Sequence, residues 1–163
     1  MTGRLRIQLN GKAVEADIDP RALLIEVVRN CGAKSARIGC LTGDCGACSL
    51  ELDGRLAKSC LVLAVSAEGS EIVTIEGSKH AIGRELQDAF VACNGFQCGY
   101  CTSGMIMVAI DLLRSNPSPS EAEIRHAISG NLCRCTGYED IVRAIGQAAA
   151  AIRANQLDNQ KGN

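Results

Sequence analysis

The sequence has few aromatic residues with which to build a core. Its 163 residues include two Phe, two Tyr and no Trp. The core must therefore be made mainly of Ala, Val, Ile and Leu, and a chain of this length holds one ordinary domain or two small ones. Small cores contribute limited stability, which bound metal can supplement.

Long apolar runs and runs of basic residues are both missing. No stretch approaches the ~20 consecutive apolar residues that cross a bilayer, so no membrane insertion is expected. The formal net charge is -1, and without a basic run the chain is not expected to bind nucleic acid. The segment Met1 to Ile18 lacks the uninterrupted apolar region of a secretory signal. This predicts a reducing, cytoplasmic location, where disulfides are rare.

Cysteine, in contrast, is abundant, and eight of the ten cysteines form two groups of four. The first group has the spacing C-x4-C-x2-C-x11-C, whose compact core with a distant fourth cysteine is typical of plant-type [2Fe-2S] ligation. Gly39, Gly43 and Gly46 lie in this loop, where they permit positive φ and the approach of backbone N–H groups to sulfur. The four predicted ligands are Cys40, Cys45, Cys48 and Cys60.

The second group of cysteines has a different spacing, C-x2-C followed after 31 residues by C-x-C. Two pairs of thiolates that meet between helix ends could hold another cluster, but spacing alone does not decide this. Structural zinc is an alternative for either C-x2-C pair, although C-x4-C-x2-C and C-x-C are not usual zinc spacings. The second group consists of Cys98, Cys101, Cys133 and Cys135.

In the first half of the chain, apolar and polar residues alternate in short segments around two turn signals. Asn10-Gly11 and Asp53-Gly54 are typical two-residue hairpin turns. Asp19-Pro20 predicts the N-cap and first residue of a buried helix. The expected elements are strands at 4–9, 13–18, 49–52, 55–57 and 71–75 and a helix at 22–28. Together they form the β-grasp layout of plant-type ferredoxins.

From Ile82 onward the apolar period becomes helical. Two helices are expected around 86–93 and 105–113, a capping box at 120–123 starts a third, and 138–152 forms a fourth. The fold class is therefore α+β, with an N-terminal plant-type ferredoxin-like β-grasp domain over 1–78. An all-α four-helix [2Fe-2S]-binding domain follows over 79–154, and a polar tail at 155–163 is expected to be disordered.

Two segments of the second half resemble the motifs of a known family. They read QCGYCT at 97–102 and GNLCRCTGY at 130–138. These closely resemble the iron-sulfur subunit of the molybdenum hydroxylases, the family of xanthine dehydrogenase, aldehyde oxidase and aerobic carbon monoxide dehydrogenase. The resemblance covers roughly residues 4–153. Most members have Pro at the position of Ser103, so the loop after Cys101 is expected to be a little less rigid here.

The resemblance implies two [2Fe-2S] clusters, one on each group of cysteines, with the second nearest the molybdopterin. It also implies that Gln97 and Cys135 contact the pterin, whereas the alternative for Gln97 is that it only satisfies backbone groups of its loop. Electrons would run from reduced molybdenum through the second cluster to the first and on to FAD. Arg134, between two predicted ligands, would favour the reduced cluster electrostatically or hold the loop.

On this interpretation the chain is the electron-transfer subunit of an oxidoreductase complex. It has no Gly-rich dinucleotide fingerprint, and neither a catalytic residue nor a substrate site is expected on it. The resemblance implies a large subunit with the molybdenum cofactor and a medium subunit with FAD, assembled as a dimer of heterotrimers. Substrate, direction of catalysis, final acceptor and cluster potentials are not set by this sequence.

Two other functions remain open at this point. A free-standing two-cluster ferredoxin would use the same ligands but expose its second cluster to small partners, and a structural or redox-sensing metal module would use the metal as a support or switch. The Met- and Ile-rich helix that begins at Met105 favours a permanent partner. Outside both groups, Cys31 and Cys93 are interpreted as packing residues. His80 is expected to be solvated in a linker, and His126 to lie on the surface or pack.

Overall fold

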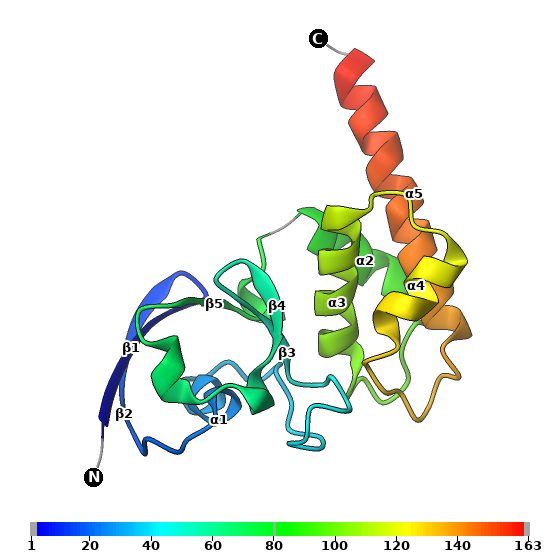
Figure 1. Ribbon diagram of the computed structural model, residues 1–163. Helices are drawn as coiled ribbons and strands as arrows, with labels where there is room; N and C mark the ends of the chain where they lie inside the picture. The colour runs from blue at the N-terminus through cyan, green and yellow to red at the C-terminus, as the bar shows by residue number, and fades with distance from the viewer. Residues whose placement is uncertain (1–2, 80, 162–163) are drawn as a thin grey trace.

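The protein has two parts, a five-stranded sheet with one helix and a group of four helices (Figure 1). The computed structural model describes residues 3–79 and 81–161, with side chains through residue 156. His80, which the sequence places in the linker between the parts, lies outside the described residues. The described residues form both helices and strands, so the fold is mixed, as predicted.

The sheet has the strand order β2-β1-β5-β3-β4. Its central strands β1 and β5 are parallel, and all other neighbours are antiparallel. Both predicted hairpin turns are present, since Asn10 and Gly11 have φ of 53° and 76°, and Asp53 and Gly54 have φ of 48° and 76°. Positive φ at both central residues matches the right-handed twist of the flanking strands. The strands are β1 (Gly3–Leu9), β2 (Lys12–Ile18), β3 (Ser49–Leu52), β4 (Arg55–Lys58) and β5 (Glu71–Val73).

One face of the sheet packs on α1 (Leu24–Asn30), and the core between them is aliphatic. The prediction that Asp19-Pro20 starts this helix is wrong. The Asp19 carboxylate instead accepts a hydrogen bond from the N–H of Arg21 in a local turn, and Glu26 caps the helix by accepting from the N–H of Leu23. The N–H of Leu24 bonds to the carbonyl of Val62, so a contact distant in sequence fixes where the helix begins.

Short 3-10 segments follow the last two strands. They are η1 (Ser59–Leu61), η2 (Ala64–Ala67) and η3 (Ile75–Gly77). Strand β5 ends at Val73, two residues earlier than expected, because the Asn10 side chain accepts a hydrogen bond from the N–H of Thr74 and η3 begins directly after.

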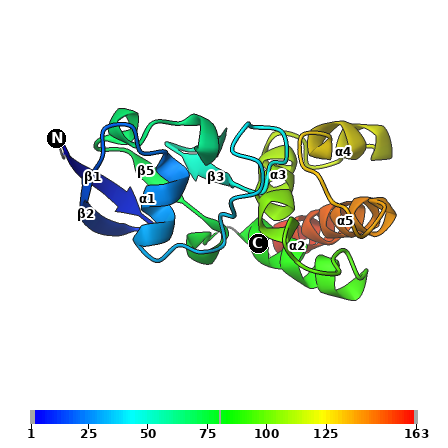
Figure 2. The ribbon, with the colours of Figure 1, turned by 90° about the horizontal axis from the view of Figure 1, so that it is seen from below.

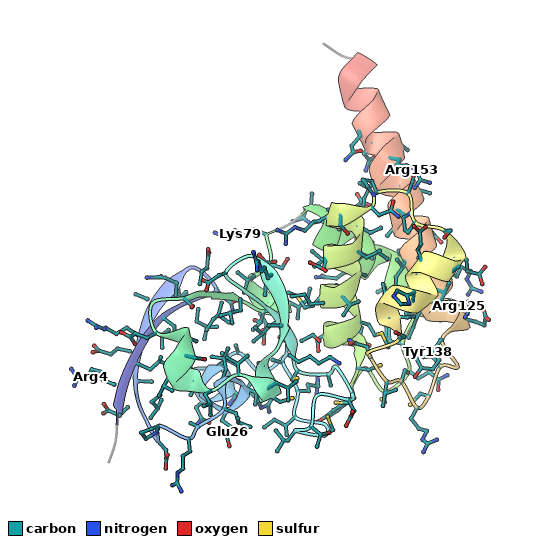
Figure 3. All side chains as sticks on the ribbon, viewed as in Figure 1. Arg4, Glu26, Lys79, Arg125, Tyr138 and Arg153 are labelled. Carbon is teal, nitrogen blue, oxygen red and sulfur yellow. The ribbon has the colours of Figure 1, made fainter. Side chains whose placement is uncertain are left out.

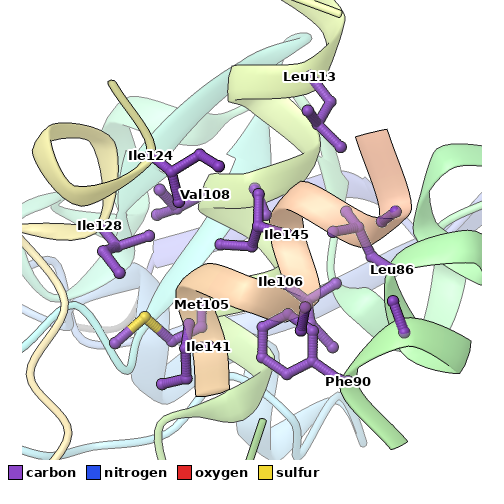
Figure 4. Close-up of a cluster of buried hydrophobic side chains, with 14 of the residues drawn as sticks. Leu86, Phe90, Met105, Ile106, Val108, Leu113, Ile124, Ile128, Ile141 and Ile145 are labelled. Carbon is purple, nitrogen blue, oxygen red and sulfur yellow. The ribbon is translucent and has the colours of Figure 1, made fainter. Parts of the chain in front are cut away.

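The second part consists of α2 (Ala81–Ala92), α3 (Thr102–Ser115), α4 (Glu121–Ile128) and α5 (Glu139–Lys161). Helix α3 is buried around most of its circumference, and side chains from the other three helices converge on it (Figure 4). The predicted capping box is confirmed, since the Ser120 hydroxyl accepts from the N–H of Glu123 and the Glu123 carboxylate accepts from the N–H of Ser120.

Helix α5 extends well past the other helices towards the C-terminus (Figure 1). It runs through most of the segment 155–163, for which the polar sequence predicts disorder. The reason is that no Pro or Gly occurs in this segment before Gly162, so nothing in its backbone chemistry stops the helix. No described helix is both long and apolar enough to cross a membrane.

The two parts are packed against each other along α3, which faces β3, β4 and η3 (Figure 2). Leu56 and Ile75 from the first part join the helical core. Arg114 of α3 forms an ion pair of 2.9 Å with the nearly buried carboxylate of Glu51 in β3. The loop that carries the first group of cysteines lies at this same junction, beside the start of α3.

Candidate metal centres

The hairpin of β3 and β4 brings two cysteines of the first group together. Ser49 pairs with Lys58 at the open end of the hairpin, so the flanking Cys48 and Cys60 meet just beyond it. Both are almost fully buried, with 2% and 4% of their surface exposed. The buried hydroxyl of Ser59 donates to the carbonyl of Cys48 at 2.7 Å, which holds the pair in register.

The other two cysteines of this group, Cys40 and Cys45, lie in the preceding loop. The N–H groups of Thr42 and Cys45 each donate to the Sγ of Cys40 at 3.4 Å. A Cβ on Gly39 would lie only 2.6 Å from the Sγ of Cys45, which explains why glycine is required there. Hydrogen bonds from the Thr42 side chain and from the N–H groups of Cys45 and Thr42 lower the pKa of Cys40 to about 6. The loop is thus built to stabilise a thiolate.

Cys60 behaves in the opposite way because it is buried beside another thiol. Burial and then the neighbouring Cys48 raise the pKa of Cys60 to about 11. Two adjacent thiolates at a buried position repel each other and become stable when a cation holds them both. This donor pair therefore fits a metal that displaces the protons on binding.

The second group is assembled from the start of α3 and the loop between α4 and α5. The Sγ atoms of Cys98 and Cys135 lie 3.6 Å apart and are exposed. The Cys101 and Cys133 thiols also interact with each other. Burial, and then the hydrogen bond and charge of Cys133, raise the pKa of Cys101 to about 12. Four cysteines that are far apart in sequence thus form two close pairs.

The loop between α4 and α5 holds Cys133 through local hydrogen bonds, one of them to Tyr138, whose position in the molecule is labelled in Figure 3. The Thr136 hydroxyl lies 3.1 Å from the Sγ of Cys133, and the N–H of Cys133 donates to the Tyr138 hydroxyl at 3.0 Å. Burial acts to raise the pKa of Cys133, but hydrogen bonds from Thr136, from the N–H of Cys135 and from the Cys101 thiol together outweigh it, so the net shift is downward. Each half of the chain therefore contains a thiol with a raised pKa and one with a lowered pKa.

The arrangement of the thiols in pairs fits a [2Fe-2S] cluster, in which four cysteines are shared between two irons. In the described residues, no three His, Cys, Asp or Glu side chains are arranged to hold one metal ion. A mononuclear zinc site needs four ligands around one point, whereas a two-iron cluster takes its ligands as two pairs. The four pairs are Cys40 with Cys45, Cys48 with Cys60, Cys98 with Cys135, and Cys101 with Cys133.

The two cysteine loops touch each other directly. The N–H of Leu132 donates to the carbonyl of Cys45 at 2.9 Å. Beside it, the amide of the buried Asn131 donates to the carbonyl of Gly46 at 3.3 Å. Gly46 has a φ of 67°, and a Cβ there would lie 1.9 Å from the Asn131 side-chain oxygen. This junction therefore requires glycine for both space and conformation.

A second set of contacts ties the Cys98 loop to the first part. The Tyr100 hydroxyl donates to the carbonyl of Ile38 at 2.6 Å, and the Arg37 guanidinium lies 5.2 Å from the centre of the Tyr100 ring. The Ser103 hydroxyl donates to the carbonyl of Ser35 at 2.6 Å. The resemblance predicts Pro at position 103. The Ser that occupies it makes a hydrogen bond between the two parts that Pro could not make.

The remaining residues singled out in the sequence lie away from these contacts. Gln97 and Arg134 are exposed, and neither side chain has a hydrogen-bond partner among the described residues. Cys31 packs against the sheet core, Cys93 is buried among the helices, and His126 is exposed on α4. The prediction that Cys31 and Cys93 are packing residues is confirmed.

Several residues that support the two sites could not be identified from the sequence. Thr136 and Tyr138 belong to the motif at 130–138, but nothing in that motif indicates the hydrogen bonds that they make to Cys133. Lys58 and Asn131 carried no signal in the sequence, because each contacts a loop that is far away along the chain. Such contacts cannot be read from local patterns.

Comparison with known proteins supports the same interpretation of the fold. Residues 74–146 match the model of a family described as [2Fe-2S] binding domain. The chain is 41% identical to the nicotine 6-hydroxylase small subunit of Paenarthrobacter nicotinovorans, over 96% of this chain and 92% of that one. It is 42% identical to a probable xanthine dehydrogenase subunit of Bacillus subtilis, over 86% of this chain and 82% of that one.

A solved structure extends this likeness to three dimensions. The crystal structure of quinoline 2-oxidoreductase from Pseudomonas putida 86 superimposes with a TM-score of 0.86 at 43% identity, over 94% of this chain and 97% of that one. The shared fold and these relatives define the class of protein as an iron-sulfur subunit of an oxidoreductase complex. The chain belongs to the family of small iron-sulfur subunits of the molybdenum hydroxylases.

Proposed function

We propose that this chain relays electrons between a molybdopterin site on a large subunit and FAD on a medium subunit, through two [2Fe-2S] clusters. The observation that carries this proposal is the direct hydrogen bond between the two cysteine loops, from Leu132 to Cys45. It brings the loop of one set of paired thiols into contact with the loop of the other. A structural metal module does not need the two loops to be joined, and the relatives that speak against a free-standing two-cluster ferredoxin are named as subunits of a hydroxylase and a dehydrogenase.

The two parts correspond to two domains in this proposal. Residues 1–78 form a plant-type ferredoxin-like domain with the β-grasp layout, supported by the parallel pairing of β1 and β5 with α1 packed across the sheet. Residues 79–154 form the four-helix [2Fe-2S]-binding domain, supported by the separate helical core. The boundary at 78 follows η3 and precedes α2.

The eight paired cysteines are the proposed cluster ligands. When bound, a [2Fe-2S] cluster accepts and donates one electron at a time. The chain's own contribution is to hold the thiolates in place, to aim backbone N–H groups at sulfur, and to bury Cys48 and Cys60 of the first site. The first cluster would bind to Cys40, Cys45, Cys48 and Cys60, and the second to Cys98, Cys101, Cys133 and Cys135.

The exposed side of the second site is the proposed docking point for the large subunit. Cys98 and Cys135 are exposed, whereas Cys101 is buried. Gln97 lies beside them with an amide that is not used by any described residue, which supports a contact with the pterin and not a role in its own loop. Cys135 would make the other pterin contact, because its sulfur lies at the surface.

The names of the relatives support a proposed assembly. Relatives are named as a small subunit, a subunit gamma and a subunit beta of hydroxylases and dehydrogenases. We propose a large molybdenum subunit and a medium FAD subunit as the partners here, in a dimer of heterotrimers. We also propose a cytoplasmic location, because the proposed cluster ligands must remain thiolates and a reducing compartment keeps them from forming disulfides.

The test is to isolate the complex from its own host through a tag on this chain, and to measure native mass, iron, molybdenum and flavin. Two [2Fe-2S] clusters give about four irons per chain. Larger chains that co-purify with molybdenum and flavin at fixed ratio would support the relay. A chain that emerges alone with the same iron content would be a free ferredoxin, and zinc in place of iron would overturn the proposal.

A further inference from the structure

Lys58 at the end of β4 connects the two cysteine loops. Its half-buried ammonium donates to the carbonyl of Gly43 at 2.5 Å and to the carbonyl of Gly130 at 3.2 Å. Gly43 lies between Cys40 and Cys45, and Gly130 lies three residues before Cys133. One cation is thus held by both loops at once.

The charge of Lys58 has no counter-ion of the ordinary kind. Among the described residues no carboxylate forms an ion pair with it, and both of its hydrogen-bond partners are neutral carbonyls. Asp44 follows Gly43 in the sequence, but its carboxylate accepts from the Thr42 hydroxyl. A partly buried cation is costly without compensating negative charge. Both carbonyls that hold the ammonium belong to loops that carry cysteines, so the thiolates of the two sites are negative charges on the segments that Lys58 contacts.

This inference rests on the proposed function, in which each site holds a [2Fe-2S] cluster. With four thiolates a cluster carries two negative charges when oxidised and three after it accepts one electron. A fixed positive charge close by stabilises the more negative state. We propose that Lys58 is a positioning residue whose charge raises the reduction potential of both clusters, and most strongly that of the first, which lies on its own hairpin.

A purely structural role would not require a charge at this position. The neighbouring carbonyl of Gly46 is satisfied by the neutral amide of Asn131, so a neutral donor can hold a loop here. Arg134, the cation singled out in the sequence, is exposed and has no partner among the described residues. Solvent and salt screen an exposed charge far more than a half-buried one. Lys58 should therefore influence the clusters more than Arg134.

The experiment compares four forms of the complex purified through this chain, namely wild type, Lys58→Gln, Lys58→Arg and Arg134→Gln. Lys58→Gln keeps a hydrogen-bond donor without the charge, and Lys58→Arg keeps both. Redox titration followed by electron paramagnetic resonance gives the potential of each cluster. In Lys58→Gln the ratio of the reduced to the oxidised form of the first cluster, measured at a fixed potential, should fall about tenfold. This corresponds to a reduction potential lower by about 59 mV for one electron. Lys58→Arg should stay close to wild type, and Arg134→Gln should shift less than Lys58→Gln.

The spin coupling between the two reduced clusters is measured in the same samples, because it reports their separation. Unchanged coupling together with a lowered potential in Lys58→Gln supports an effect of charge. Three results would overturn the inference while leaving the relay intact. They are equal shifts of the reduction potential in Lys58→Gln and Lys58→Arg, no shift of the potential in either variant, and loss of iron from Lys58→Gln alone. A wild-type complex with fewer than about four irons per chain would instead overturn the proposed function itself, and the inference with it.

Discussion

The carbonyl of Cys45 accepts a hydrogen bond of 2.9 Å from the N–H of Leu132, the residue directly before Cys133. A bonded route between the two candidate centres therefore crosses one hydrogen bond between main-chain atoms. The same contact also fixes how the sheet and the helices sit relative to each other. Changes at this junction should alter both the stability of the protein and the occupancy of its metal sites.

Replacing a buried thiol of the second site should remove one cluster only. Cys101→Ser is expected to lower the iron content from about four to about two per chain, because the hydroxyl is a poor substitute for a thiolate ligand. The control is Cys93→Ser, since Cys93 is also buried in the helical core but its thiol bonds to the Gln147 side chain. Iron analysis and electron paramagnetic resonance give the result. Equal iron loss in both variants would contradict the ligand assignment.

A methyl group at Gly46 should disrupt the junction. In Gly46→Ala the new Cβ would lie 1.9 Å from the Asn131 side chain and 2.6 Å from the carbonyl of Gly130. The expected loss is about 3 kcal/mol of unfolding free energy, as for overpacking at a rigid site. Gly54→Ala is the matched control, because Gly54 also has positive φ but no atom within 4 Å of its Cβ position.

The control should therefore show the conformational cost alone, about 1 kcal/mol. Urea-induced unfolding of the iron-loaded protein, followed by circular dichroism, separates the two variants. A loss in Gly46→Ala no larger than that in Gly54→Ala would mean that Asn131 moves aside freely.

Removing the hydroxyl of Ser103 should weaken the tie between the two parts. Ser103→Ala leaves the carbonyl of Ser35 without its donor, at an expected loss of about 0.5–1.5 kcal/mol. Ser115→Ala serves as the control, because its exposed hydroxyl bonds only to carbonyls of its own helix. The free energy of unfolding of Ser115→Ala should differ from that of wild type by no more than about 0.5 kcal/mol. The same unfolding measurement tests both, and a control effect as large as the Ser103 effect would count against the tie.

The Glu76 carboxylate should make the protein less stable in acid. Burial acts to raise its pKa, but hydrogen bonds from Ser35 and Thr74 outweigh this, so the net pKa is lowered from the ordinary value of 4.5. A group with a lowered folded-state pKa contributes stability that is present above its unfolded pKa and is lost as pH falls through the folded pKa. The loss should therefore begin below the ordinary value.

Glu76→Gln should remove this part of the pH dependence. The measurement is the difference in unfolding midpoint between wild type and variant at neutral pH and at several values from about pH 5 down to about pH 2. The difference should be large at neutral pH and shrink in acid. Glu85 lines the same cleft beside α2. Glu85→Gln is therefore the control, because it also removes one negative charge from this cleft. A difference that does not change with pH would rule out the carboxylate as its source.

Local signals predicted the elements that local chemistry determines. Asn10-Gly11 and Asp53-Gly54 form their turns because positive φ at both residues suits Asn, Asp and Gly. The capping box at Ser120 works for a similar reason, since donor and acceptor are three residues apart. The spacing of the cysteines likewise indicated the two groups of thiols before their positions were known.

Contacts between distant segments could not be predicted in this way. Helix α1 begins at Leu24 and not near Pro20 because Leu24 bonds to Val62. Lys58 and Asn131 reach carbonyls that are 72 and 85 residues away in the sequence. The close pairing of Cys98 with Cys135 also depends on how α3, α4 and α5 pack, which periodicity alone does not specify.

Helix α3 approaches the first cysteine loop so closely that a Cβ on Gly104 would lie 2.4 Å from the carbonyl of Gly46. At this point main chain faces main chain, and the Asn131 side chain, 3.0 Å from that Cβ position, fills the space beside them. A larger residue at either Gly46 or Gly104 should therefore require the loop and α3 to move apart. A chimera that joins the first half of one family member to the second half of another should keep the contact between the first cysteine loop and α3 wherever both parents carry glycine at positions 46 and 104.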